Sequence, residues 1–253
     1  MQSSTVTNKE VTKQYTIAID ALCEIARTYF FLGKLAAARH ILHTSLPLLE
    51  TSISEPQLRI KLLLEYAKIL IVDHLLTRKD ADLLFSTILQ AKQLAESAHD
   101  QLSTAEALGL LGQAHYFTTI SSSLNNGASP DSPQDQGKFD KALTYQQQAL
   151  NLRETLHDTR GMSESLFQIG SIYERWQQYD TAREYYTKAR QIADQYDYSF
   201  EKVEPARHFA LLALMGGKLD QALTFALQAL SLREAIGFMP YLPLDHLLLS
   251  TIY

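Results

Sequence analysis

The 253-residue sequence is poor in cysteine, glycine and proline, and each scarcity excludes a class of protein. Cys23 is the single cysteine, so an internal disulfide or a CxxC metal site is excluded and a reducing compartment is indicated. Only 10 glycines and 7 prolines leave few turn residues for an all-β design, which favours helices. No apolar run reaches the ~18 residues that span a bilayer. We therefore expect a helical, cytoplasmic protein in which Cys23 is a buried helical thiol.

Excess positive charge is also lacking. The sequence has 23 Lys and Arg against 28 Asp and Glu, scattered along the chain, so no basic stripe is available for a phosphate backbone. The motifs GxxxxGK[ST], GxGxxG, GxSxG and HExxH do not occur. His40 and His43 are three residues apart, but no carboxylate or cysteine completes a zinc set with them. We expect no nucleic-acid partner, no membrane, no metal, no cofactor and no enzymatic activity.

What the sequence does contain is a repeat. A small residue recurs once in each predicted first helix, at Ala26, Ala67, Gly112, Gly170, Ala210 and Ser250. The intervals are 41, 45, 58, 40 and 40 residues, so the longest one contains an insertion of 18. Residues 119–136, rich in Ser, Asn, Gly, Pro and Asp, match that insertion in length and are expected to be disordered.

Second helices repeat as well. After Gly33, Gly137 and Gly217 come the related segments KLAAARHILHTSL, KFDKALTYQQQAL and KLDQALTFALQAL. The glycine supplies a turn between antiparallel helices, and a small alanine lets their backbones approach closely. Asp158, and Asp100 one repeat earlier, read as helix-start signals.

The clearest unit, residues 162–193, contains SLFQIGSIYERWQQYDTAREYYTKARQIA and resembles the tetratricopeptide repeat family. With its period near 40, the chain resembles the long-helix arrays of bacterial regulators and kinesin light chains over roughly residues 17–253. The resemblance is weak for residues 58–98. It implies an all-α, right-handed α-solenoid of about five helical hairpins plus a terminal half-hairpin. We expect a polar N-terminal segment, residues 1–14, and then a single solenoid over residues 15–253, interrupted by the insertion at 119–136.

In this family the first helices line the inside of the curve, and the resemblance implies a groove there that binds a protein or peptide. Helical spacing around the small residues gives the candidates Arg27, Phe30, Phe31, Lys68, Gln113, Tyr116, Phe117, Phe167, Ser171, Glu174, Arg175 and Arg207. Ile71 and Val72 share this spacing. Aromatic and Arg side chains are common interface anchors. The competing interpretation is that these residues only pack.

The leading functional hypothesis is therefore a non-catalytic adaptor or sensor module. One alternative is the regulatory portion of a larger transcription or signalling protein. Another is a homotypic scaffold that dimerises through its C-terminal helix, where Leu247, Leu248 and Leu249 make an apolar end. A third, an enzyme with a cryptic site, has no motif in its favour. The sequence leaves the identity of the partner open.

Overall fold

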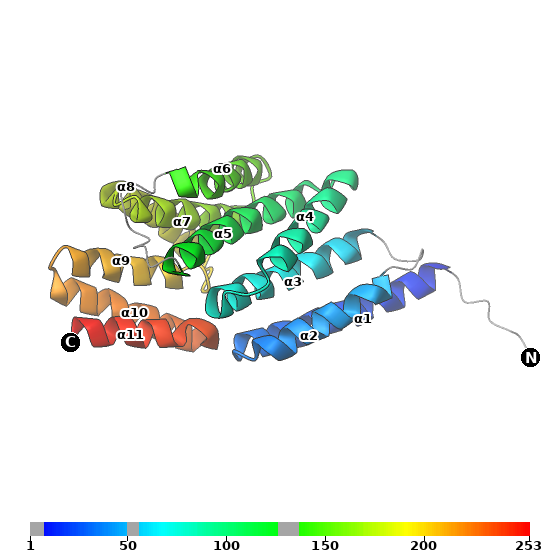
Figure 1. Ribbon diagram of the computed structural model, residues 1–253, viewed down its shortest axis with the longest axis horizontal. Helices are drawn as coiled ribbons and strands as arrows, with labels where there is room; N and C mark the ends of the chain where they lie inside the picture. Colours follow the sequence, from blue (N-terminus) through cyan, green and yellow to red (C-terminus); the bar gives the residue numbers. More distant parts are fainter. Residues whose placement is uncertain (1–7, 50–55, 126–136) are drawn as a thin grey trace, which may run out of the picture. The chain divides into compact units, whose positions relative to one another are not determined.

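The computed structural model describes residues 8–49, 56–125 and 137–253 (Figure 1). Within these ranges the regular elements are all helices, which confirms the all-α prediction. The chain forms two compact units, unit 1 from Met1 to Ala107 and unit 2 from Leu108 to Tyr253, and each is described by itself. Among the helices of the described ranges, none is both long enough and apolar enough to cross a membrane.

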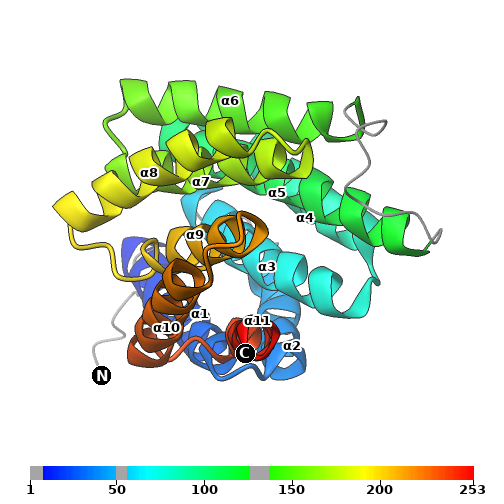
Figure 2. The same ribbon diagram turned by 90° about the vertical axis from the view of Figure 1, so that its left-hand side faces the viewer.

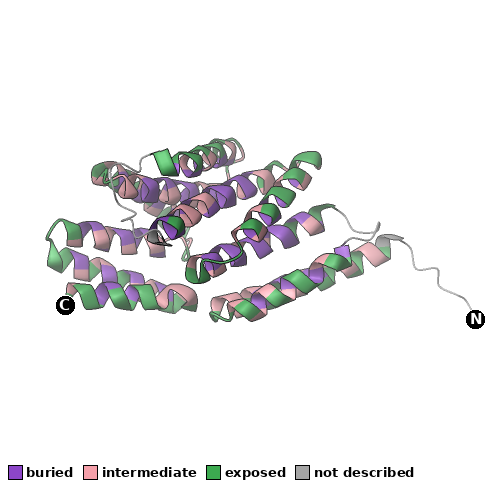
Figure 3. Cartoon of the chain, in the orientation of Figure 1, coloured by how far each residue is buried: buried purple, intermediate pink, exposed green. Residues whose placement is uncertain are grey.

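Unit 1 contains two antiparallel helical hairpins. The elements are α1 (Asn8–Phe31), α2 (Leu35–Ser45), the 3-10 helix η1 (Leu46–Leu49), α3 (Pro56–Thr77), α4 (Ala81–Ser97) and the first residues of α5 (Gln101–Asn125). Gly33, between α1 and α2, has the left-handed φ of 73° that the tight turn requires. Helix α3 is buried on most sides, as expected for a helix that is apolar all round (Figure 3). The weakly matching segment 58–98 is thus a hairpin like the others.

Unit 2 continues the same arrangement. Its further elements are α6 (Asp140–Thr155), α7 (Thr159–Arg175), α8 (Tyr179–Gln195), α9 (Val203–Met215), α10 (Leu219–Ile236), the 3-10 helix η3 (Met239–Tyr241) and α11 (Leu242–Ile252). The second helices α6 and α8 lie above α5 and α7 in Figure 1, and Figure 2 shows α6 again at the outer edge of this group. Counted over the described residues, the pairs α1/α2 to α9/α10 are five hairpins, and α11 is the predicted half-hairpin.

The small residues of the first helices lie where two helices touch. Ala26, Ala67 and Ala210 are fully buried, whereas Ser250 is exposed. A Cβ atom on Gly112 would lie 2.6 Å from Nε2 of Gln146, on the second helix of the same hairpin. Helix contact at these positions therefore depends on the missing side chain, as the repeat predicts.

Two helix-start predictions are confirmed. The carboxylate of Asp158 accepts a hydrogen bond of 3.0 Å from the Gly161 amide, and that of Asp100 accepts one of 3.0 Å from the Ser103 amide. These bonds satisfy amide groups that have no partner within the helix. Cys23 is buried as expected, and burial raises the pKa of its thiol to about 11.

Two predicted boundaries need correction. Residues 119–125 are the end of helix α5 rather than part of a disordered insertion. Ile120 anchors this last stretch in a buried cluster, and the Thr119 hydroxyl donates to the His115 carbonyl at 2.7 Å, so the polar composition does not end the helix. The remainder of the insertion, residues 126–136, lies outside the described residues.

The polar N-terminal segment, residues 1–14, is the second correction, because α1 already begins at Asn8. Val11 and Tyr15 are half-buried two turns and one turn, respectively, before the buried Ile19, so the apolar stripe of α1 starts earlier than the composition indicated. Residues 1–7 lie outside the described residues, and a single continuous solenoid over residues 15–253 stays a prediction.

Candidate binding face of the first helices

Unit 2 contains a continuous line of hydrogen-bonded polar side chains that joins α7, α8, α9, α10 and α11. We call it the polar chain, and its members in order of contact are Glu174, Tyr186, His208, Arg207, Glu204, Arg233 and Asp245. Two of its members, Glu174 and Arg207, were predicted as groove residues from helical spacing. The polar chain therefore organises the part of the first helices that the sequence marked for binding.

The polar chain begins at a carboxylate of α7 that contacts side chains of α8 and α9. Glu174 Oε2 accepts a 2.9 Å hydrogen bond from the Tyr186 hydroxyl and lies 2.8 Å from Nδ1 of His208. On the other side of the ring, Nη2 of Arg207 lies 2.9 Å from Nε2 of His208. His208 thus faces a guanidinium group at Nε2 and a carboxylate at Nδ1, and these two contacts fix the orientation of its ring.

The second half of the chain is centred on a buried arginine. Arg233 is 2% exposed and donates from Nε to Asp245, which is 1% exposed, and from Nη2 to Glu204 at 2.6 Å. Arg207 donates to the other oxygen of Glu204 at 3.0 Å. Two guanidinium groups therefore share one carboxylate, each at its own oxygen, and helix α11 supplies a second carboxylate to Arg233.

Arg153 occupies the same repeat position on α6 as Arg233 does on α10. Its Nη1 donates at 2.8 Å to Ser165, and in both cases the partner lies 12 residues further along the chain. Arg153 also donates at 2.8 Å to the Gly161 carbonyl. An arginine with a partner 12 residues later therefore recurs at this repeat position. Of the two arginines, only Arg233 has a fully buried carboxylate as that partner.

The electrostatics of the polar chain keep its carboxylates on α7 and α9 ionised. Burial alone would raise the pKa of Glu204, but Arg207 and Arg233 lower it more strongly, to about 2. For Glu174, burial is likewise outweighed, here by His208 and Tyr186, and its pKa is lowered. Burial and the charge of Glu174 raise the pKa of Tyr186 well above its usual value. Stable charge pairing of this kind positions groups and does not prepare an acid or base for catalysis at neutral pH.

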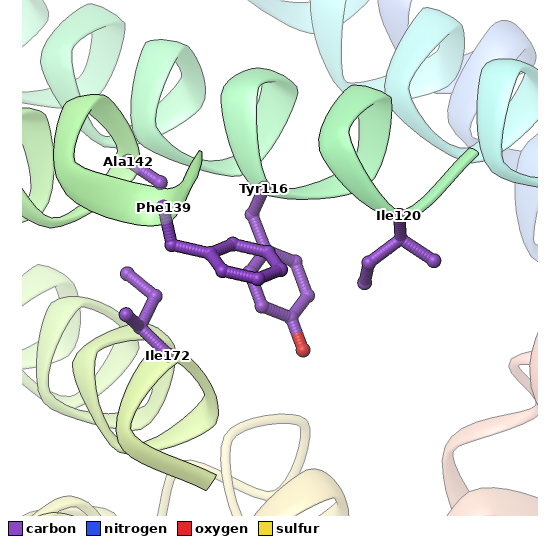
Figure 4. Close-up of a cluster of buried hydrophobic side chains, with 5 residues drawn as sticks. All are labelled: Tyr116, Ile120, Phe139, Ala142 and Ile172. Atoms are coloured by element: carbon purple, nitrogen blue, oxygen red, sulfur yellow. The ribbon is translucent and has the colours of Figure 1, made fainter. Parts of the chain in front are cut away.

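An aromatic cluster adjoins the start of the polar chain. Tyr116 and Ile120 of α5 meet Phe139, Ala142 and Ile172, with the Tyr116 hydroxyl directed away from α5 (Figure 4). Nε of Arg175 donates to that hydroxyl at 3.1 Å, which fixes the arginine next to Glu174.

Two further aromatic side chains pack next to the aromatic cluster and the polar chain. Phe117 packs edge-on to Tyr116 at 5.2 Å, and Phe167 stacks on Tyr186 at 5.5 Å between ring centres. Phe167 also meets the ring of His208 at 5.1 Å. Arginines held among aromatic rings are the composition expected of an interface anchor.

The predicted residues of unit 2 divide by exposure. Tyr116 and Ser171 are buried, so they support the face from within, as the competing packing interpretation had it. The others are half-buried and keep part of their surface accessible, namely Gln113, Phe117, Phe167, Glu174, Arg175 and Arg207. We call these six residues the binding face.

In unit 1 the predicted residues engage in a different kind of contact. Arg27 pairs with Glu24 at 2.7 Å and with Glu65 at 3.3 Å, and Lys68 pairs with Glu65 at 3.0 Å and Glu106 at 2.6 Å. These pairs join α1, α3 and the start of α5 through partly exposed groups, which contribute little stability.

The apolar candidates of unit 1 lie at neighbouring positions. Phe30 and Phe31 are half-buried and meet edge-on at 6.2 Å. Ile71 and Val72, whose spacing had suggested the inner face, are buried in the core. The packing interpretation therefore holds for these two residues.

Sequence reasoning did not identify five members of the polar chain as site residues: Glu204, His208, Arg233, Asp245 and Tyr186. A signal for the first two exists, because Glu204 and His208 are one helical turn apart in the otherwise apolar segment VEPARHFALLALM. The recurrence of Leu-Arg-Glu at residues 152–154 and 232–234 marks Arg233. No local pattern indicates Asp245, whose role depends on the approach of α11 to α10.

Comparison with known proteins supports the repeat assignment. A family model described as tetratricopeptide repeat matches residues 134–195 and 164–235. Residues 134–235 therefore match the tetratricopeptide repeat family. The match falls on the hairpins that carry most of the polar chain. A search of curated proteins found no match for this sequence.

Solved structures of similar fold are known. The crystal structure of BtubC (BKLC) from P. vanneervenii aligns with a TM-score of 0.56 at 16% identity, over 93% of this chain and 83% of that one. A signal transduction ATPase with numerous domains (STAND), with a tetratricopeptide repeat sensor, from Pyrococcus horikoshii aligns with a TM-score of 0.52 at 14% identity. The alignment covers 94% of this chain but only 33% of that protein. At these identities the similarity concerns the fold alone.

Proposed function

We propose that the chain is a non-catalytic, cytoplasmic module that binds a peptide or protein segment on the binding face of unit 2. The observation that carries the proposal is the position of Arg175 and Arg207. Both arginines are half-buried; Arg175 is held by the Tyr116 hydroxyl, and Arg207 by Glu204 and His208 of the polar chain. Side chains fixed before binding lose little conformational freedom on binding, so they make efficient anchors.

The face also fits the chemistry of a peptide better than that of a small substrate. Its polar members lie along three helices, α5, α7 and α9, and alternate with Phe117 and Phe167. An extended segment with apolar side chains and at least one hydrogen-bond acceptor for Arg175 would use both kinds of contact. The family supports this proposal, since tetratricopeptide repeats are generally protein-interaction modules.

The test is selection of ligands from a random peptide library by the parent chain, followed by calorimetric measurement of each selected peptide. Arg175→Ala and Gln113→Ala remove side chains of the binding face, and we expect each to weaken binding by about tenfold or more, or ~1.4 kcal/mol. Arg183→Ala is the matched control, because Arg183 is exposed on the second helix α8. Peptides that bind both face variants as tightly as the parent would refute the proposal.

A second candidate is that this module serves as the sensor of a larger signalling protein. The observation in its favour is the likeness to the STAND protein, in which a region of this fold accompanies further domains. In that case the same face receives the signal, and the peptide experiment applies unchanged. Binding of the selected peptide would then alter the activity of a protein that carries this module, which an activity assay with and without peptide would measure.

A further inference from the structure

Arg207 is held on the binding face by a carboxylate that does not itself belong to that face. Its Nε donates a 3.0 Å hydrogen bond to Oε2 of Glu204, one helical turn earlier on α9. The other oxygen of Glu204 accepts a 2.6 Å hydrogen bond from Nη2 of Arg233 on α10. One guanidinium group therefore meets each oxygen, and the position of Arg207 depends on how Arg233 uses its own donors.

Asp245 of α11 occupies the edge of Arg233 that is best suited to a carboxylate. Nε of Arg233 donates to Oδ2 of Asp245, and Nη2 lies 3.4 Å from Oδ1 of the same carboxylate. The neighbouring nitrogens Nε and Nη2 can form two parallel hydrogen bonds to one carboxylate, which is the strongest arrangement for an arginine. Because Asp245 occupies this edge, Arg233 meets Glu204 with Nη2 and leaves Oε2 to Arg207.

The groups that join Asp245 to Arg207 are shielded from water. Asp245 and Arg233 are buried, and Glu204 is half-buried. Water therefore replaces a lost carboxylate only poorly at this place, and a buried guanidinium group that loses one carboxylate gains most by turning to the other. At the equivalent repeat position Arg153 meets the neutral Ser165 instead, so the link between two carboxylates belongs to Arg233.

We propose that Asp245, which lies outside the binding face, positions Arg207 for peptide binding by holding Arg233 away from Oε2 of Glu204. Without the carboxylate of Asp245, the Nε and Nη2 edge of Arg233 turns to Glu204 and binds both of its oxygens. Arg207 then loses the hydrogen bond that fixes its Nε. A side chain that is mobile before binding must be ordered by the ligand, which weakens the complex. The effect of Asp245 on affinity rests on the proposed function.

The central variant is Asp245→Asn, which keeps the shape of the side chain and removes its charge. The Nε–Hε signal of Arg207 in nuclear magnetic resonance spectra of the free chain reports on its hydrogen bond to Glu204 and needs no peptide. We expect this signal to shift and its proton to exchange faster with water. We also expect selected peptides to bind about threefold to tenfold more weakly in calorimetry. Glu234→Gln, at an exposed carboxylate next to Arg233 in the sequence, is the control and should behave like the parent in both measurements.

A double variant, Arg233→Met with Asp245→Leu, separates positioning from a purely structural role. Replacement of a buried ion pair by apolar residues of similar size is often tolerated. Because Arg233 is then absent, Glu204 keeps its hydrogen bond to Arg207, and we expect the Arg207 signal and the peptide affinity to return to those of the parent. If Asp245 served only to pack α11, the double variant would be at least as impaired as Asp245→Asn.

Three results would overturn the proposal. The Arg207 signal of Asp245→Asn equals that of the parent, or the double variant keeps the altered signal. In the third, the signal changes but peptide affinity does not, although Arg175→Ala binds more weakly. If Arg175→Ala and Gln113→Ala both bind as the parent does, the proposed function fails, while the Arg207 signal still decides whether Asp245 positions the arginine. Circular dichroism establishes that each variant is folded, and Asp245→Ser, which copies the pairing of Arg153 with Ser165, replaces Asp245→Asn if it is not.

Discussion

The residue opposite the small position of each first helix differs in kind between the two units. In unit 1 this second-helix position holds Leu42 and Ile88, whereas in unit 2 it holds Gln146, Tyr186 and, in the last hairpin, Ala226, all of them buried. The helices pair in the same way in both cases. Only in unit 2 does a buried side chain at this position bear polar atoms, and the Tyr186 hydroxyl donates a hydrogen bond to Glu174 on the first helix of its hairpin. One repeat geometry can therefore support either an apolar core or an organised polar face.

The largest difference between the units should appear when an ion pair is broken in each. Arg233→Ala leaves Asp245 buried without its cation, and we expect a loss of about 3–5 kcal/mol in the free energy of unfolding. Lys68→Ala in unit 1 removes a cation that is 39% exposed and should cost about 1 kcal/mol or less. Urea unfolding followed by circular dichroism and by Trp176, in unit 2, measures both. Equal losses would contradict the comparison.

The fold itself was predictable from the sequence because hairpin packing is encoded locally. Glycine at the α1/α2 turn, small residues at close approaches and aspartates at helix starts are each read from a few neighbouring residues. The polar chain was not predictable in the same way. The pairing of Glu174 with His208 joins residues 34 positions apart, and it depends on the distance at which α9 packs on α7. Helix spacing identified Glu174 and Arg207 but not their partners.

Acid should weaken unit 2 through Glu204. Its folded pKa of about 2 lies below the ordinary value of 4.5, so its stabilising effect is complete above pH 4.5 and is lost as the pH falls toward 2. The shift corresponds to roughly 3 kcal/mol. In Glu204→Gln this dependence is absent, and the difference in unfolding free energy from the parent should shrink between pH 5 and pH 2. The exposed Glu184→Gln is the control for the loss of one surface carboxylate.

The packing of the small position can be tested at Gly170. A Cβ atom there would lie 2.7 Å from Cε1 of the buried Tyr186, and crowding of this kind costs about 1–3 kcal/mol. The higher helix propensity of alanine offsets up to ~1 kcal/mol, so Gly170→Ala should be destabilising by about 1–2 kcal/mol in thermal or urea unfolding. At Gly216, the nearest atom to a new Cβ is 3.4 Å away, and Gly216→Ala should be near neutral. A stabilised Gly170→Ala would show that the hairpin is looser than described.

The smallest effect is expected where a residue of unit 2 is made to resemble unit 1. Gln146→Leu removes the 2.8 Å hydrogen bond to the Gly109 carbonyl, but it also removes the buried Oε1, which accepts no hydrogen bond from the described residues. These contributions oppose each other, so the change in unfolding free energy should stay within about 1 kcal/mol. A loss above about 3 kcal/mol would mean that Gln146, like Tyr186, belongs to an essential polar network.

The boundary errors have a physical cause as well. Serine and threonine composition predicted that α5 ends near Thr119, but their hydroxyls bond to carbonyls of their own helix while Ile120 is buried against Phe139. Tertiary packing thus decides where such a helix ends. The same holds for Asp245. Its neighbours in the sequence do not distinguish it from a surface aspartate, and its role depends on the packing of α11 on α10.

The most direct test of the binding face is a nuclear magnetic resonance titration of the isotope-labelled chain with a peptide selected on it. The account predicts that the largest shifts fall on α7, on α9 and on the α5 residues around Gln113, including the side-chain signals of Arg175 and Arg207. Shifts confined to the outer helices α6, α8 and α10, or to unit 1, would contradict it.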